Sequence, residues 1–295
     1  MKIFITGATG FIGKHLVRKL VDERNDITIN LYGEEQSPFE ANVNTYSLNE
    51  NFIEKDIEFL KNHSFDGIIH LASLYLTTHK PEDAIRLINS NVSFSTYILE
   101  CASQANIKWF INTGTFWQHY QNANYSPVNL YAATKQAFES IAQYYVETEK
   151  IIFCTIKLSD TFGPNDTRPK IFNLWDKFAN TGDPLKMSSG NQVIDISYSD
   201  DIINAFILLA KELQSNNKEI LNGNTYAVKS KNRYTLKELA SIFEKTTNKK
   251  IKIEWGALPY REREVMNPWS KGQIVPNWKQ QLSLEEGIRK VFFKT

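Results

Sequence analysis

The sequence has little cysteine and little histidine, and neither residue is arranged for cross-linking or metal binding. Its two cysteines, Cys101 and Cys154, lie in apolar stretches without CxxC spacing, so we expect buried thiols rather than a disulfide framework. The five histidines are scattered, and no His/Cys cluster has zinc-ligand spacing, so no metal is predicted. Free thiols favour a reducing compartment, and we predict a cytoplasmic protein.

Long apolar runs and an excess of one charge are also absent. No window holds the roughly 18 uncharged apolar residues that span a bilayer. The N-terminal MKIFITGATG lacks the apolar core and cleavage site of a signal peptide. Lys and Arg total 34 against 33 Asp and Glu, which gives a formal net charge of +1. This balance argues against nucleic acid and against a membrane surface as partners.

What is present is the composition of a folded globular chain, with 42% hydrophobic and 23% charged residues. Its 295 residues favour about two domains. In the first half, short apolar runs predict strands at residues 2–6, 27–31, 67–72, 107–113 and 151–158. Helical spacing of apolar residues predicts helices from Phe11 onward and at 52–62, 81–105 and 131–149. This alternation indicates an α/β fold with a doubly wound parallel sheet.

After Gly163-Pro164 the alternation becomes irregular. Helices are predicted at residues 171–180, 200–213, 235–246 and 284–292, and strands at 187–196, 225–228 and 250–255. We interpret residues 1–165, with returning segments at about 190–228, as a larger domain. Residues 166–189 and 229–295 are predicted to form a smaller, mixed α/β C-terminal domain.

The strongest local motif is Gly7-Ala8-Thr9-Gly10-Phe11-Ile12-Gly13, directly after the first predicted strand. A phosphate-binding turn needs glycines for a tight bend and for close approach of the backbone to pyrophosphate. It also needs the free N–H groups of a helix N-terminus. The alternative is a simple Gly-rich turn, but the strand before and the amphipathic helix after favour nucleotide binding.

A second motif, Tyr131-Ala132-Ala133-Thr134-Lys135, opens a predicted helix. Residues four apart share a helix face, so the phenol and the ammonium group project together. A nearby cation favours phenolate, and we expect Lys135 to lower the pKa of Tyr131 toward neutrality for proton transfer. Such pairs also occur by chance on exposed helices. Thr113, at the end of the preceding strand, adds weight because its hydroxyl can face the same reacting carbonyl.

Several motifs occur in a fixed order: TGATGFIG, HLAS, Asn91-Val92, NTGTFW, SPVNLYAATK and DTFGPND, followed by GNQVIDISYSDD and GALPYRERE. This series resembles the extended short-chain dehydrogenase/reductase family, whose members are mostly NAD(P)-dependent epimerases, dehydratases and reductases of nucleotide sugars. The resemblance covers nearly the whole chain. TFWQHY, GPNDTRPK and GALPYRERE are most similar to reductases of 4-keto nucleotide sugars, of the CDP-abequose/CDP-paratose synthase type.

The resemblance implies a Rossmann-type fold whose larger domain binds the dinucleotide and whose smaller domain binds the substrate. It implies a catalytic triad of Thr113, Tyr131 and Lys135, and a structural role for Asn91, which would tie the sheet to the active-site edge. The implied cofactor contacts are Gly7, Thr9, Gly10, Phe11, Ile12, Gly13, Leu71, Ala72, Ser73, Tyr131 and Lys135.

We expect the substrate to be bound by loops at the carboxyl ends of the strands. The expected contacts are Tyr75, Thr113, Thr115, Trp117, Asp160, Lys170 and Arg261. Many nucleotide-sugar enzymes of the family contact the diphosphate with an Arg where this chain has Ile194. Lys170, Arg168 and Arg261 are candidate replacements, and the alternative for each is a solvated surface cation.

Two departures from the family pattern narrow the prediction. The 4,6-dehydratases carry an Asp-Glu pair where this chain has Gly114 and Thr115, and neither residue is a general acid or base, so dehydratase activity is excluded. NAD-preferring members carry an acid at the end of the second strand. The stretch Leu31-Tyr32-Gly33-Glu34-Glu35 has none there unless Glu34 reaches back, and no Arg for a 2′-phosphate. We favour NADP(H) over NAD(H), partly because biosynthetic reductases usually use it.

The resemblance therefore predicts an NAD(P)H-dependent reductase of a 4-keto-6-deoxy nucleotide-diphosphate sugar, which would serve surface polysaccharide (O-antigen) biosynthesis. The first alternative is a nucleotide-sugar 4-epimerase that retains NAD. The second is a non-catalytic, dinucleotide-sensing protein of the same fold. The resemblance also implies a homodimer, with Phe138 and Tyr145 either at its interface or in the core.

Overall fold

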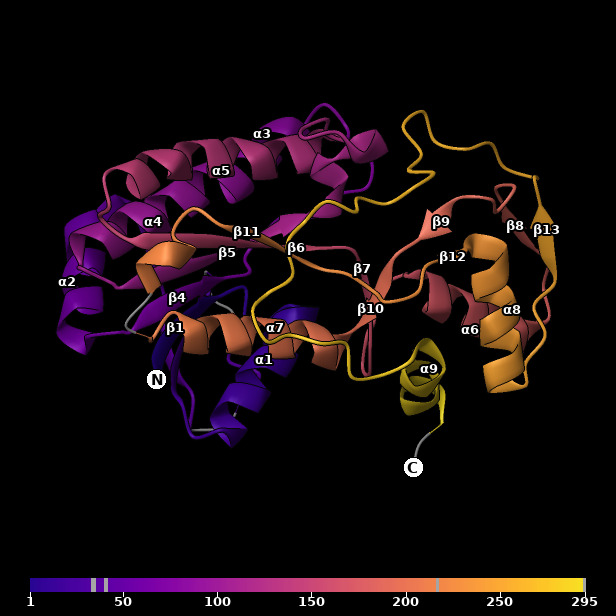
Figure 1. Cartoon of the computed structure of the whole chain (residues 1–295), viewed down its shortest axis with the longest axis horizontal. Helices are drawn as coiled ribbons and strands as arrows, with labels where there is room; N and C mark the ends of the chain where they lie inside the picture. The colour runs from indigo at the N-terminus through magenta and orange to yellow at the C-terminus, as the bar shows by residue number, and fades with distance from the viewer. Residues whose placement is uncertain (33–35, 40–41, 216–217, 294–295) are drawn as a thin grey trace.

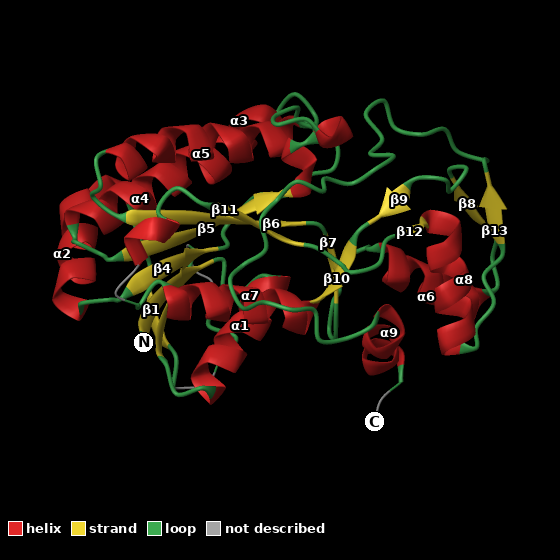
Figure 2. Cartoon of the chain, viewed as in Figure 1, coloured by secondary structure: helices red, strands yellow, loops and turns green. Residues whose placement is uncertain are grey.

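The centre of the protein is one twisted sheet of seven strands, in which every neighbouring pair runs parallel (Figure 1; Figure 2). The computed structural model describes residues 1–32, 36–39, 42–215 and 218–293. Across the sheet the order is β11 (Thr225–Val228), β6 (Ile152–Leu158), β5 (Trp109–Thr115), β4 (Gly67–His70), β1 (Lys2–Thr6), β2 (Asp26–Asn30) and β3 (Asn44–Tyr46). The predicted α/β fold with a parallel sheet is confirmed.

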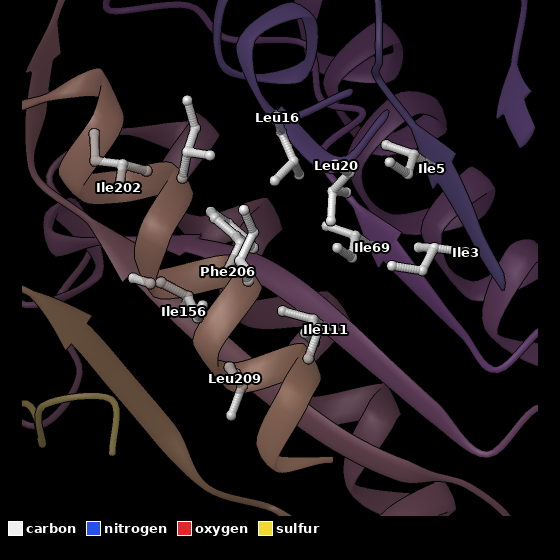
Figure 3. Packing of buried hydrophobic residues seen from close by; sticks show 14 of the residues in the cluster. Ile3, Ile5, Leu16, Leu20, Ile69, Ile111, Ile156, Ile202, Phe206 and Leu209 are labelled. Atoms are coloured by element: carbon white, nitrogen blue, oxygen red, sulfur yellow. The ribbon is translucent and has the colours of Figure 1, made fainter. Parts of the chain in front are cut away.

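Helices cover both faces of this sheet, because alternate strand residues are apolar on opposite sides. On one face, Ile3 and Ile5 of β1 pack with α1 (Phe11–Asp22) and α7 (Ser199–Glu212), as Figure 3 shows. On the other, Phe4 packs with α2 (Ile53–His63), α4 (Phe94–Gln104) and α5 (Leu130–Glu147). The buried strands are therefore fixed in register by two apolar layers.

A smaller cluster of elements lies beyond the carboxyl ends of the strands, on the right in Figure 1. It contains α6 (Ile171–Thr181), α8 (Leu236–Thr247) and α9 (Leu284–Phe292). Three short strand pairs accompany them: β7 (Asp160–Phe162) with β10 (Ile196–Tyr198), β8 (Leu185–Met187) with β13 (Ile253–Trp255), and β9 (Val193–Ile194) with β12 (Tyr234–Thr235). Phe172, Trp175 and Phe243 form its separate aromatic core.

Residues 256–283 are all described by the structure and contain no helix or strand. We call this segment the strap. The strap leaves β13, crosses to the sheet edge near β11, and returns past α7 to α9 (Figure 1). Trp278 donates its indole N–H to the carbonyl of Asp201 at 2.8 Å. The side chains of Lys229 and Arg233 donate to strap carbonyls at Gly272 (2.7 Å) and Trp269 (2.7 Å). These bonds hold an irregular segment beside the large sheet.

One sequence prediction about elements is confirmed with a local change, and another is wrong. The helix predicted at 81–105 is present, and it runs without interruption through α3 (Asp83–Ile88), a π-helical turn at Asn89–Ser93, and α4. The wider turn lets Asn91 reach backbone groups of the loop after β4. The strand predicted at 187–196 is instead divided among β8, β9 and β10, because Gly190 turns the chain with a φ of +73°.

Other observations settle smaller points. Phe138 and Tyr145 are buried in the α2/α4/α5 layer, so of the two alternatives the core is their place in this chain. The homodimer and the division into two domains remain predictions.

Cys101 and Cys154 are free and buried, as expected. No helix of the described residues is long and apolar enough to cross a membrane. Within the same residues, no group of three His, Cys, Asp or Glu side chains could hold a metal ion.

Candidate active site

The Gly-rich turn joins β1 to α1 and lies against the chain leaving β4. Gly7 has a φ of +70°, and its carbonyl accepts a hydrogen bond from the Gly10 N–H at 3.1 Å. A Cβ on Gly7 would lie 2.4 Å from the Ala72 nitrogen, and one on Gly13 would lie 2.3 Å from the Gly7 oxygen. Only glycine fits both positions, because any side chain would collide with backbone.

The N-terminus of α1 is open to an anion. Gly10 precedes the helix and supplies no side-chain cap, and the first turn carries no acidic residue. The uncapped N–H groups and the positive end of the helix dipole therefore suit a phosphate. The cradle of glycines and this helix end together fit the pyrophosphate of a dinucleotide such as NAD(P).

The catalytic candidates meet at the same carboxyl edge of the sheet. Thr113, near the end of β5, donates its hydroxyl proton to the His70 carbonyl at the end of β4, at 2.9 Å. Tyr131 and Lys135 lie in the first two turns of α5, which Asn129 caps by accepting from the Ala132 N–H at 3.0 Å. The sequence motifs therefore identify one shared edge, next to the Gly-rich turn.

Burial controls the ionisation of the Tyr131–Lys135 pair. It raises the pKa of the Tyr131 phenol, and the nearby phenol of Tyr75 raises it further, while a hydrogen bond with Ser73 lowers it. Burial also lowers the pKa of the Lys135 ammonium to about 8, against the carboxylate of Glu139, which raises it. In the chain by itself the pKa of Tyr131 is therefore shifted upward, opposite to the shift expected from Lys135 alone, because burial disfavours the phenolate.

Two buried polar residues brace this edge from beneath. The His70 ring bonds Thr6 Oγ1 at 2.7 Å through Nδ1 and Ser95 Oγ at 2.9 Å through Nε2, and burial lowers its pKa so that it stays neutral. Asn91 accepts from the Leu74 N–H at 2.8 Å and donates to the Thr134 hydroxyl at 3.0 Å. Asn91 therefore ties the loop after β4 to α5, in the role that the family resemblance implies.

Aromatic rings pack beside the catalytic candidate Tyr131. The ring centres of Tyr75 and Tyr131 are 5.0 Å apart with nearly perpendicular planes, and those of Tyr75 and Trp117 are 5.8 Å apart. The Lys170 ammonium lies 4.7 Å from the centre of the Tyr75 ring and donates to its hydroxyl at 3.3 Å. Four residues singled out in the sequence therefore meet in space.

The candidate phosphate-binding cations have different surroundings. Lys170 is 3.5 Å from the carboxylate of Asp160, and Arg261 is exposed on the strap. Arg168 is engaged: it donates to Asp166 at 2.7 and 2.8 Å, and its guanidinium stacks 4.2 Å from the centre of the Phe11 ring. The structure therefore assigns Arg168 to holding the loop after β7 against α1.

Thr115 also has a structural task. Its hydroxyl caps the 3₁₀ turn Phe116–Gln118 by accepting from the Trp117 N–H at 3.3 Å, and its own N–H donates to Gln118 Oε1 at 2.9 Å. Substrate contact by Thr115 remains a prediction. The capping turn directs the half-buried Trp117 ring toward Tyr75.

Sequence reasoning missed a buried ion pair beside the triad. Lys157 of β6 lies 3.1 Å from Glu139 of α5, and it donates to His119 Nε2 at 2.9 Å. The only available signal was a lysine inside the otherwise uncharged strand IFCTIKL. Arg263 on the strap was missed as well, and it donates to the Ser126 hydroxyl at 2.7 Å.

With this geometry in view, comparisons with known proteins identify the family. A model of the NAD dependent epimerase/dehydratase family matches residues 3–223. The chain belongs to this family. The prediction of an extended short-chain dehydrogenase/reductase is thereby confirmed.

Relatives of the family match almost the whole chain. A CDP-abequose synthase of Salmonella muenchen is 28% identical over 98% of this chain and 96% of its own. A second one, from Salmonella typhimurium, is 26% identical over the same shares. Among solved structures, the UDP-glucose 4-epimerase of Thermotoga maritima superposes with a TM-score of 0.83 at 18% identity, covering 99% of this chain and 97% of the other. The structural likeness shows the fold.

The strand end that separates NAD from NADP specificity is only partly described. β2 ends at Asn30, followed by the buried Leu31 and the exposed Tyr32. Glu34 and its neighbours at 33–35 lie outside the described residues. The preference for NADP(H) therefore remains a prediction.

Proposed function

We propose that this protein is an NAD(P)H-dependent reductase of a 4-keto-6-deoxy nucleotide-diphosphate sugar. The bound nicotinamide supplies the hydride for the keto carbon at C4. Tyr131 donates a proton to the carbonyl oxygen, and its raised pKa suits it to remain protonated at neutral pH until that transfer. Thr113 turns its hydroxyl from the His70 carbonyl to hydrogen-bond the same oxygen and orient it.

Lys135 and the loops hold the reactants. The Lys135 ammonium, charged below pH about 8, binds the nicotinamide ribose and stabilises negative charge developing on Tyr131. Tyr75 and Trp117 present ring faces to the sugar, Asp160 accepts from its hydroxyl groups, and Lys170 and Arg261 contact the diphosphate. We propose NADPH as the preferred cofactor because β2 ends at Asn30, with no acid there or at Leu31 and Tyr32. We propose O-antigen biosynthesis as the setting on the basis of the CDP-abequose synthase relatives.

One observation separates reduction from dehydration: the triad is complete, and no acid follows Thr113. The same triad would serve a 4-epimerase, which the consumption of NADPH distinguishes from a reductase. The space of a side chain at Gly114 is taken by neighbours, because a Cβ there would lie 2.8 Å from Glu139 Oε1 and 2.9 Å from Gln118 Oε1. Thr115 uses its hydroxyl as a cap. A dehydratase needs an acid and a base here for elimination, whereas ketone reduction needs only Tyr131, Thr113 and Lys135.

The test uses purified protein, NADPH and 4-keto-6-deoxyhexose sugars prepared in CDP, dTDP and GDP forms. Loss of the reduced-nicotinamide absorbance, matched mole for mole by sugar product, supports the reductase and names the nucleotide. The Tyr131→Phe variant is the matched control, and we expect it to bind NADPH without oxidising it.

Other results would redirect the assignment. An unchanged NADPH signal with every sugar, together with bound NAD in the purified protein and interconversion of 4-epimers, would replace the reductase with an epimerase. Dinucleotide binding without NADPH oxidation or epimer interconversion, in both the wild type and Tyr131→Phe, would favour the non-catalytic, dinucleotide-sensing alternative.

A further inference from the structure

A buried polar cluster lies directly behind the catalytic edge, and the proposed chemistry does not use it. Its members are Gln118, His119, Glu139 and Lys157, which we call the Glu139 cluster. Glu139 Oε2 is 3.1 Å from Lys157 Nζ, and Glu139 Oε1 accepts from Gln118 Nε2 at 3.0 Å. The side chains of Lys157 and Glu139 are only 4% and 11% exposed. Both carboxylate oxygens are therefore held by buried donors.

The Glu139 cluster touches each catalytic element. Glu139 follows Lys135 by four residues and Tyr131 by eight, so all three lie on one face of α5. The cluster also packs against the backbone beside Thr113, because a Cβ on Gly114 would lie 2.8 Å from both Glu139 Oε1 and Lys157 Cγ. A displacement of Glu139 would therefore change the packing both of α5 and of the end of β5.

Lys135 is a buried cation with few charged neighbours. It is 1% exposed, and burial lowers its pKa to about 8 although the Glu139 carboxylate raises it. The other titratable groups near it are neutral: burial lowers the pKa of His70 on β4 and raises the pKa of Tyr131. A buried ammonium group without a counter-charge loses its proton more readily.

The remaining charge in the cluster belongs to Lys157. His119 Nε2 accepts a hydrogen bond from the Lys157 ammonium at 2.9 Å. Burial lowers the pKa of His119 to about 4, and the nearby Lys157 charge is the second cause. His119 is therefore neutral and stacks on Trp269 of the strap, with ring centres 4.0 Å apart. Lys157 in turn fixes the Glu139 carboxylate in place.

We propose that Glu139 is a positioning residue of the active site, which acts through space on the Lys135 ammonium while Lys157 and Gln118 hold its carboxylate. Glu139 touches neither the reacting carbonyl nor the hydride path in this role. It keeps Lys135 charged, and therefore able to bind the ribose and assist Tyr131, across the neutral pH range. The effect of Glu139 on the charge of Lys135 can be measured without the proposed function. Its effect on cofactor binding rests on that function.

The direct test reads Lys135 without any cofactor. Titration of isotope-labelled lysine side chains by NMR, with the Lys135 signal assigned from Lys135→Arg, gives its midpoint. In Glu139→Gln, which is isosteric, we expect the midpoint to fall by about one pH unit. The control is Glu147→Gln, because Glu147 is an exposed acid of the same helix that accepts from Gln143 at 3.0 Å. It should leave the midpoint unchanged.

A double variant separates this role from a merely structural one. Glu139→Gln leaves Lys157 buried without its counter-charge, which itself destabilises the fold. Glu139→Gln/Lys157→Met removes both charges, and thermal unfolding shows whether stability returns. Our proposal expects the Lys135 midpoint to stay low in the double variant. A return to the wild-type midpoint once both charges are gone would overturn it, and so would an unshifted midpoint in both variants.

Cofactor binding gives the second readout. NADPH affinity, measured by fluorescence from pH 6 to 10, should weaken at lower pH in Glu139→Gln than in the wild type, by the same roughly one pH unit. If the wild type binds no nicotinamide dinucleotide, the proposed function fails, while the NMR result still decides the role of Glu139.

Discussion

The two sides of the candidate site are built by different means. The side that we propose for the cofactor is made mainly of backbone from one short run, Gly7 to Gly13, which packs against the chain at Ala72. The substrate side is made of side chains, such as Tyr75, Trp117 and Lys170, from segments far apart in the sequence. A site built from backbone allows many residue types between its glycines, but the glycines themselves cannot carry a Cβ. A site built from side chains can change its specificity by single substitutions. In the proposed function, the first side would bind the cofactor and the second would select the substrate.

The largest effect should come from filling the backbone cradle. Gly7→Ala places a Cβ 2.4 Å from the Ala72 nitrogen, so we expect loss of NADPH binding together with lower stability. Gly182→Ala is the matched control, since Gly182 has a similar φ of +75° but no neighbouring heavy atom within 4 Å. Both variants share about 1–2 kcal/mol of left-handed strain. Calorimetry and fluorescence binding should find the cofactor lost only in Gly7→Ala; a similar loss in both would refute the steric argument.

The next largest effect should come from removing the Tyr131 hydroxyl, which lies where the two sides of the site meet. Tyr131→Phe removes the proton donor but keeps the ring that packs at 5.0 Å against Tyr75. We expect kcat to fall by about 10²–10⁴-fold, with unchanged NADPH affinity and melting temperature. Steady-state kinetics beside a binding titration measures both. A kcat within a few-fold of the wild type would show that another group supplies the proton.

The substrate side should respond more weakly and in a different constant. Arg261→Ala removes an exposed strap cation, and we expect KM for the nucleotide sugar to rise about tenfold while NADPH affinity is unchanged. Arg168→Ala makes the useful contrast, because its guanidinium is bound to Asp166 and stacked on Phe11. It should lower the melting temperature instead. If Arg168→Ala raised KM more than Arg261→Ala, the assignment of these two cations would be reversed.

The smallest predicted effect is a pH dependence confined to the cofactor side. Lys135 has its pKa lowered to about 8, so it is charged below this pH and loses its charge as the pH rises through it. From pH 7 to 8 the charged fraction falls by about half, and NADPH affinity should fall about twofold. In Lys135→Arg, whose guanidinium does not titrate in this range, the affinity should be flat over the same interval.

The elements that sequence reasoning placed correctly are those with strong local patterns. Buried apolar runs identified β1, β4, β5 and β6, and their alternation with amphipathic helices gave the parallel sheet. The failures were short or interrupted elements. β3, β7 and β12 have two or three residues each and carry too little pattern. The π-helical turn at Asn91 was not predicted, because it accompanies bonds to backbone groups of another segment.

The site also has features that local sequence predicted and features that it did not. The glycine turn and the Tyr131–Lys135 spacing were readable because a tight turn and a shared helix face are local requirements. The ionisation of that pair was not, since it depends on burial by the whole fold: the raised pKa of Tyr131 opposes what a neighbouring lysine alone suggests. Nor could residue type distinguish Lys170, which lies on the Tyr75 ring, from Arg168, which is bound to Asp166.

By itself, the sequence determined the β1–turn–α1 unit and the family, because the first follows from spacing within one short segment and the second from motifs in a fixed order along the chain. It also predicted the residues of the triad. Only the tertiary structure decided that Lys170 meets Tyr75, 95 residues away, and that Lys157 meets Glu139 beneath the triad. Contacts of this kind join charges on separate elements. Which cation reaches which partner is fixed by the packing of sheet and helices, and no local spacing records it.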